Sequence, residues 1–181
     1  IAAYNAVTRI DDFAFVPEQQ ISHGVTTFVA QNRGAGNTGR IIAGFRRGLL
    51  LETMYFAIIC AAVFIFRERI MTLFISGEGA ADVIAEGELY LSVMAFLYIF
   101  PAYTNCIQGF FRGVGNMSVT LVSTFIQASM RVLFTFILVP HMGIHAIAYA
   151  CAIGWVLMLL FEVPYYFHCK RKHIDTEGRA A

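Results

Sequence analysis

Leu89–Phe111 (LYLSVMAFLYIFPAYTNCIQGFF) is a run of 23 residues without a charged side chain. At a rise of about 1.5 Å per residue, a helix of this length covers about 34 Å, slightly more than the roughly 30 Å hydrocarbon core of a bilayer. Three further apolar runs hold one charged residue each: residues 49–66 with Glu52, residues 117–140 with Arg131 and residues 143–167 with Glu162. All four runs are therefore predicted to cross a membrane as helices.

The composition agrees with a membrane protein and argues against a soluble domain. Hydrophobic residues make up 58% and charged residues 14% of the 181 positions, whereas soluble chains have about 45–50% and about 25%. The net charge of +1 provides no field that would attract nucleic acid. We expect an all-α, polytopic transmembrane bundle that binds membrane lipid and no nucleic acid.

A fifth, more polar segment precedes the four apolar runs. Residues 2–31 carry Arg9, Asp11, Asp12 and Glu18, with Pro17 near the middle. Such a segment can lie in a membrane only where protein or a water-filled cavity covers its polar side. We therefore expect a bundle over residues 1–167, with about five spans (about 2–31, 48–66, 89–111, 117–140 and 143–167), and a basic cytoplasmic tail over 168–181.

The distribution of Lys and Arg predicts the orientation. Nine of the 13 fall in alternate connections and in the tail: Arg33, Arg40, Arg46, Arg47, Arg112, Lys170, Arg171, Lys172 and Arg179. Only Arg67 and Arg69 fall on the opposite side. Cytoplasmic loops are enriched in basic residues, so the C-terminus is expected in the cytoplasm.

Three of the spans carry polar side chains at helical spacing. Thr120, Thr124, Gln127, Arg131 and Thr135 share one face of residues 117–140. A second line is Tyr90, Tyr98, Pro101, Asn105, Gln108 and Arg112, and a third, on residues 2–31, is Asn5, Arg9, Asp12, Gln20, His23, Thr27 and Gln31. We call each of these lines of polar side chains a polar stripe. Hydrogen bonds between helices explain any single stripe, whereas three stripes together indicate a polar pathway.

A pentapeptide occurs twice, as Arg33-Gly-Ala-Gly-Asn37 and Arg112-Gly-Val-Gly-Asn116. Each copy follows a span that descends to the predicted cytoplasmic side. Arg suits the negative end of a helix dipole, Gly allows a left-handed cap and Asn can begin the next helix. Helix termination alone explains the residue types within each copy. An internal repeat explains why the pentapeptide occurs twice.

The sequence resembles the multidrug and toxic compound extrusion (MATE) family. The resemblance rests on Arg9–Asp11, Phe13, Pro17, the stretch TFVAQNRGAGN at 27–37 and Arg40-Ile41, together with Gln108–Asn116 and with Val139, Pro140 and Gly143. It implies a transporter of the plasma (inner) membrane, built from two six-helix lobes around a cavity. The chain is then helices eight to twelve of the C-terminal lobe, and the N-terminal lobe of the same polypeptide is its missing partner.

The resemblance also implies a secondary active multidrug efflux transporter that exchanges drugs or organic cations for Na⁺ or H⁺, with no cofactor, no metal site and no enzymatic activity. Some members carry an acid in the tenth helix, but residues 89–111 contain none. Asp11, Asp12 and Glu18 are therefore the candidates for ion coupling. Pro17 and Pro101 lie inside spans and are candidate hinges.

The expected cavity residues are polar and aromatic side chains of the stripes: His23, Tyr98, Tyr103, Asn105, Gln108, Gln127 and Arg131. Three alternatives remain. A lipid-linked oligosaccharide flippase of the same superfamily would need a more cationic cavity than Arg9 and Arg131 provide. A structural membrane module would have no transport of its own, and a metalloenzyme would rest on His141 and His145, which lack a nearby carboxylate.

Overall fold

The computed structural model describes residues 2–74, 80–143 and 145–170, with side chains from residue 11 onward except at 73–83, 86 and 145. Within these residues the chain is helical apart from short turns and contains no strand, which confirms the predicted all-α class. The helices are α1 (Ala2–Gly34), α2 (Thr38–Phe74), α3 (Ala80–Leu97), α4 (Ile99–Gly113), α5 (Met117–Met142) and α6 (His145–Cys169). Most of the predicted basic tail, residues 171–181, lies outside the described residues.

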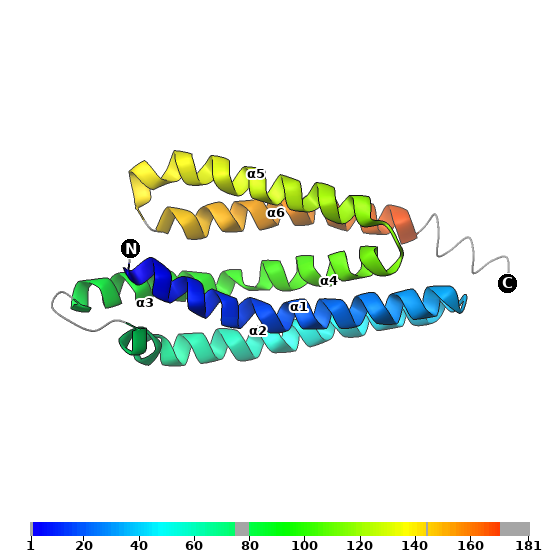
Figure 1. Ribbon diagram of the computed structural model, residues 1–181, viewed down its shortest axis with the longest axis horizontal. Helices are drawn as coiled ribbons and strands as arrows, with labels where there is room; N and C mark the ends of the chain where they lie inside the picture. The colour runs from blue at the N-terminus through cyan, green and yellow to red at the C-terminus, as the bar shows by residue number, and fades with distance from the viewer. Residues whose placement is uncertain (1, 75–79, 144, 171–181) are drawn as a thin grey trace.

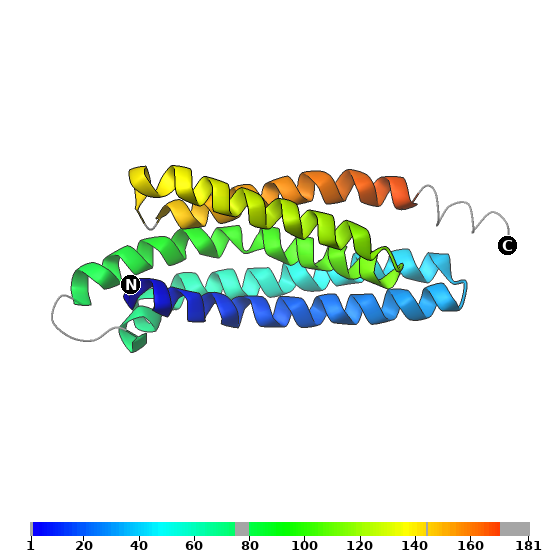
Figure 2. The ribbon, with the colours of Figure 1, turned by 45° about the horizontal axis from the view of Figure 1, so that its top comes forward.

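The helices run roughly antiparallel along one long axis (Figures 1 and 2). The hairpin of α1 and α2 lies on one side, the hairpin of α5 and α6 lies on the other, and α3 followed by α4 passes between them. Helix α4 contacts α1, α2 and α6. It is thus the central helix of the bundle, and its side chains face most of its neighbours.

The run 89–111, predicted as one span, is divided between two helices at Tyr98. Helix α3 ends at Leu97 and α4 begins at Ile99. Pro101 has no backbone N–H, so the carbonyl of Leu97 cannot accept the usual hydrogen bond from four residues ahead. On either side of this gap the ladder continues, with Tyr98 N–H donating to Met94 at 3.0 Å and Ala102 N–H donating to Tyr98 at 3.2 Å.

The two copies of the pentapeptide form the same turn. Gly36 has φ +69° and Gly115 has φ +75°, a region that favours glycine. Asn37 N–H donates to Asn32 O at 2.9 Å, and Asn116 N–H donates to Phe111 O at 2.8 Å. Both helices therefore end in a Schellman motif, and the Arg33 guanidinium of the first turn donates to the Val114 carbonyl of the second.

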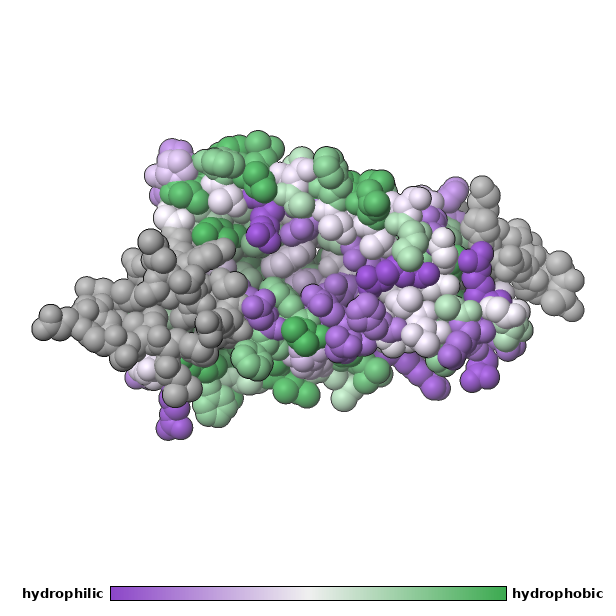
Figure 3. Space-filling view, viewed as in Figure 1, coloured by the Kyte–Doolittle hydropathy of each residue, from purple (hydrophilic) through white to green (hydrophobic). Residues whose placement is uncertain are grey.

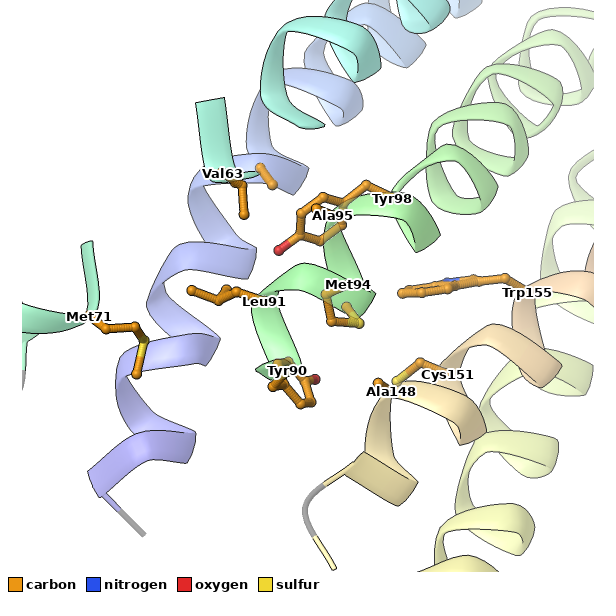
Figure 4. Packing of buried hydrophobic residues seen from close by; sticks show 11 residues of the cluster. Val63, Met71, Tyr90, Leu91, Met94, Ala95, Tyr98, Ala148, Cys151 and Trp155 are labelled. Atoms are coloured by element: carbon orange, nitrogen blue, oxygen red, sulfur yellow. The ribbon is translucent and has the colours of Figure 1, made fainter. Parts of the chain in front are cut away.

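Apolar packing forms two clusters along the bundle. One surrounds the α3–α4 junction, where Leu91, Met94 and Tyr98 pack with Trp155 and Cys151 of α6 (Figure 4). The other joins α1, α2, α4 and α6 near the two turns and includes Val25, Val29, Ile41, Phe45, Cys106, Phe110 and Phe111. These clusters fix α4 against its neighbours.

Four helical stretches are long and apolar enough to cross a membrane: 38–72, 87–113, 117–142 and 146–169. Helices α2 and α5 expose large apolar side chains to the surroundings, among them Leu51, Ile58, Leu121, Phe125 and Phe136. Helix α1 is the fifth long helix, but it falls below this level of hydropathy because of its polar residues. The arrangement is that of a multi-pass membrane bundle, with lipid as the solvent for α2 and α5.

Candidate functional site

A polar pocket of about 270 Å³ lies between α1, α4, α5 and α6. Its lining is Phe15 and Gln19 of α1, Pro101, Thr104, Asn105 and Gln108 of α4, Thr124, Gln127 and Arg131 of α5, and Trp155 and Met158 of α6. Hydrophilic side chains gather around the middle of the face between the α5–α6 pair and α1 (Figure 3). The stripes predicted on α4 and α5 thus meet at one place.

The α4 side of the pocket is fixed by hydrogen bonds. Gln108 Nε2 donates to Ser123 Oγ and to Thr124 Oγ1, both at 3.3 Å. The hydroxyl of Ser22 on α1 donates to the carbonyl of Asn105. These bonds connect α4 to both α5 and α1: the Gln108 side chain is held against α5, and the backbone at Asn105 is held against α1.

The α5 side of the pocket depends on close packing against α6. A Cβ atom added to Gly154 would lie 3.0 Å from the carbonyl oxygen of Gln127 and 3.7 Å from the Cβ of Arg131. Ala146 and Ala150, at the same helical spacing, are fully buried. This small-residue face lets the backbones approach and sets the position of Gln127 and Arg131, while the Arg131 side chain remains exposed.

Three of the expected cavity residues lie elsewhere. Tyr98 is fully buried, and its hydroxyl donates to Asp11 Oδ1 at 2.6 Å. Tyr103 faces α2, with its hydroxyl 3.2 Å from Thr53 Oγ1. His23 is exposed on α1 and does not line the pocket. Asn105, Gln108, Gln127 and Arg131 are therefore the predicted cavity residues that the fold brings together.

The polar stripe of α1 lies on its exposed side. Asp12, Gln20, His23, Thr27 and Gln31 are all exposed, while the side chains of Asn5 and Arg9 fall outside the described residues. Polar side chains at membrane depth need water or another part of the protein beside them. Helix α1 therefore presents an exposed polar face next to the pocket.

The three acidic candidates of α1 occupy different environments. Asp11 accepts the hydrogen bond from Tyr98, and Asp12 is exposed. Glu18 is fully buried with the Asn105 side chain beside it, and neither carboxylate oxygen makes a hydrogen bond of normal geometry with a described residue. An ionised carboxylate in such surroundings needs a counter-charge, which distinguishes Glu18 from the other two.

Two further buried carboxylates were not singled out as candidates from the sequence. Glu52 of α2 and Glu162 of α6 are fully buried, and their oxygens also make no hydrogen bond with a described residue. Glu52 interacts electrostatically with Glu18, and Glu162 faces Ser123 and Gln108 behind the pocket. Each is the single acidic residue of a long apolar run, and this isolation is the sequence feature that could have identified it as a candidate.

The remaining sequence candidates are placed as follows. Pro17 lies inside the uninterrupted α1, and Pro101 lines the pocket beside the break at Tyr98. His141 is exposed at the end of α5, and the His145 side chain is outside the described part. No group of three potential metal ligands occurs among the residues whose side chains are described.

Several known proteins are similar to this chain. A family model described as MatE matches residues 1–137. The probable multidrug resistance protein NorM of Thermotoga maritima is 24% identical over 141 residues, which are 77% of this chain and 30% of that protein. The probable multidrug resistance protein YpnP of Bacillus subtilis is 27% identical over 127 residues, or 70% of this chain and 28% of that protein.

The fold has a counterpart among solved structures. A multidrug resistance MATE family transporter of the MOP superfamily, in its inward-facing conformation, matches with a TM-score of 0.83 at 17% identity. The match covers 99% of this chain and 40% of that one, so the chain spans well under half of the relatives it matches. The family model covers most of the sequence, and the chain belongs to the MatE family, which is a family of membrane transporters and not of enzymes.

Proposed function

We propose that the chain is part of the C-terminal lobe of a secondary active efflux transporter for drug-like amphiphiles. The observation that carries the proposal is the polar pocket assembled from α1, α4, α5 and α6 within an otherwise apolar bundle. Its relatives from Thermotoga maritima and Bacillus subtilis are described as probable multidrug resistance proteins. In the full-length protein, the N-terminal lobe would cover the exposed polar face of α1 and complete the cavity.

The pocket offers complementary surfaces to an amphiphile. The rings of Phe15 and Trp155 pack edge to face at 6.0 Å between centroids and give an aromatic wall, which attracts organic cations. Asn105, Gln108 and Gln127 offer amide donors and acceptors. Arg131 is the charged residue of the described lining, so a cation would depend on the aromatic wall and the amide oxygens for its binding.

Replacement of the two glutamines tests the cavity. We expect Gln108→Leu and Gln127→Leu, made in the full-length protein, to raise the accumulation of at least one organic cation in expressing cells. Thr72→Leu is the control, because Thr72 is exposed near the end of α2, outside both the pocket and the polar face of α1. Unchanged export of every tested cation by both pocket variants, with normal membrane levels, would refute the assignment.

For ion coupling we propose Glu18 together with Glu52. Both are fully buried without a hydrogen bond to a described residue, they come from neighbouring helices, and they interact electrostatically. Two buried carboxylates without a basic partner form a site for a proton or a small cation. Asp11, engaged by Tyr98, and Asp12, exposed, are weaker candidates.

Transport in proteoliposomes identifies the coupling ion. The full-length protein is reconstituted, and drug exchange is measured under an imposed Na⁺ gradient or an imposed pH gradient. We expect one gradient to drive exchange, and Glu18→Gln and Glu52→Gln to reduce that drive at least tenfold. Glu68→Gln, at an exposed position of α2, should behave as wild type. Wild-type coupling in both Glu18→Gln and Glu52→Gln would exclude these two residues as the coupling site.

The alternatives make different predictions in the same assays. A lipid-linked oligosaccharide flippase would bind pyrophosphate in the pocket, where Arg131 is the charged residue of the described lining, so this function has less support. A structural module would show no gradient-driven exchange in the full-length protein. We also propose residence in the plasma (inner) membrane with a cytoplasmic C-terminus.

A further inference from the structure

A second cavity, unrelated to the polar pocket, is a groove of about 450 Å³ along the outside of the α1–α2 hairpin. Its lining is apolar except for two guanidinium groups, Arg40 and Arg47 of α2. No acidic residue lines it. The groove therefore combines an apolar trough with two positive charges, Arg40 at one end and Arg47 further along it.

Glycines shape the groove. A Cβ atom on Gly44 would lie 2.2 Å from Cε1 of Phe28, and one on Gly48 would lie 2.5 Å from Cγ2 of Val25. The two helices therefore touch at the floor of the groove. Gly24 differs, because a Cβ there would meet no atom within 4 Å, and the space above it is open.

The two arginines have no partner within the described protein. Arg40 and Arg47 lie seven residues apart on one face of α2, and both are exposed. The ion pair of the described residues, between Arg67 and Glu88, is at the other end of α2. Neither guanidinium of the groove makes a hydrogen bond with a described residue. Each guanidinium presents paired N–H donors suited to phosphate oxygens, and both line the same groove.

The groove runs along α2 from its basic end into its apolar run. Arg40 and Arg47 are about 10 Å apart along the helix axis, and Leu51 lies about 6 Å beyond Arg47. Arg47 lies just before the apolar run, and Leu50, Leu51 and Met54 follow with more than half of their surface exposed. The two arginines are therefore on the headgroup side of the groove, and Leu51 is on the side of the acyl chains.

We propose that this groove is a binding site for an anionic phospholipid. The phosphate lies between Arg40 and Arg47, and one acyl chain lies against Gly48 and Leu51 in the trough. Basic pockets between transmembrane helices on the cytoplasmic side are a recurrent form of lipid recognition. The site does not depend on transport.

Lipid binding by the purified full-length protein tests the proposal, with native mass spectrometry as the readout. At about a fivefold change per basic residue near an anionic headgroup, Arg40→Gln with Arg47→Gln should weaken phosphatidylglycerol binding about 30-fold. Phosphatidylcholine binding should change little. Arg46→Gln is the matched control, because Arg46 is exposed on the same helix outside the groove.

A second variant separates a lipid from a free anion. Gly24→Leu fills the open space without a clash at its Cβ, so it should weaken phosphatidylglycerol binding at least fivefold with an unchanged thermal midpoint. Inorganic phosphate alone should not compete at millimolar concentration. An equal loss of phosphatidylglycerol binding in Arg46→Gln would show that the lipid is attracted by the basic surface in general. Tight binding of inorganic phosphate that Gly24→Leu leaves unchanged would show that the groove binds an ion and not a lipid. Either result overturns the proposal.

Discussion

At the scale of single residues, the least expected feature is the placement of acidic side chains. Glu18, Glu52 and Glu162 are fully buried, and none of their carboxylate oxygens makes a hydrogen bond of normal geometry with a described residue. A buried polar group without a partner lowers stability. A residue that costs stability in this way is commonly retained for function.

Replacement of Glu52 by methionine should separate stability from function. We expect Glu52→Met, which has similar volume and no polar oxygens, to raise the free energy of unfolding by about 1–3 kcal/mol while it reduces gradient-driven exchange. Thermal unfolding in detergent and transport in proteoliposomes measure the two effects. The exposed Glu68→Met should change stability by no more than about 0.5 kcal/mol, and a strongly destabilised Glu52→Met would show that the carboxylate has a structural partner.

At the scale of the elements, contact between helices depends on small residues of α4. A Cβ atom on Gly109 would lie 2.6 Å from the Ser22 carbonyl oxygen, and one on Gly113 would lie 2.6 Å from the Val29 Cβ and 2.8 Å from the Thr26 carbonyl oxygen. Helix α1 therefore packs backbone to backbone on α4. This contact sets the distance between the polar face of α1 and the pocket.

Substitution at this contact should loosen the bundle. We expect Gly113→Ala to lower the free energy of unfolding by about 1–3 kcal/mol, because the added methyl group meets backbone atoms that cannot rotate away. Gly34→Ala, near the end of α1 with no atom within 4 Å, should be neutral or slightly stabilising. Thermal unfolding of the purified protein compares the two, and equal stability would show that α1 and α4 are less closely packed.

Helical spacing in the sequence predicted which polar residues share a face, and it grouped Asn105 with Gln108 and Gln127 with Arg131, as the pocket has them. Helical spacing within one segment does not show which neighbouring helix each face contacts. Tyr103 therefore contacts Thr53 of α2, and His23 is exposed away from the pocket. Those positions depend on contacts between segments far apart in the chain.

A search for repeated polar positions also overlooks residues that occur once. Glu52 and Glu162 each stand alone in an apolar run, and no periodicity includes them. Their burial results from where α2 and α6 pack on α4. The apolar runs predicted the helices well because length and hydropathy are local properties, whereas these carboxylates acquire their environment only in the assembled bundle.

At the scale of the whole molecule, the charge distribution follows the long axis. The turns that join α1 to α2 and α4 to α5, and the end of α6, all lie at one end of the bundle (Figure 1). That end holds Arg33, Arg40, Arg46, Arg47, Arg112 and Lys170 of the described chain, and Arg67 and Arg69 lie toward the other end of α2. The arginine-rich end is the one expected in the cytoplasm.

Labelling of single cysteines tests this orientation. In a full-length protein without its native cysteines, we expect Ala35→Cys, in the first turn, to react with a membrane-impermeant maleimide only after the cells are permeabilised. Met142→Cys, exposed at the opposite end of α5, should react in intact cells, because the two sites lie on opposite sides of the hydrocarbon core. The reverse pattern would place the basic turns outside and would also remove the cytoplasmic leaflet as the source of the lipid proposed for the α1–α2 groove.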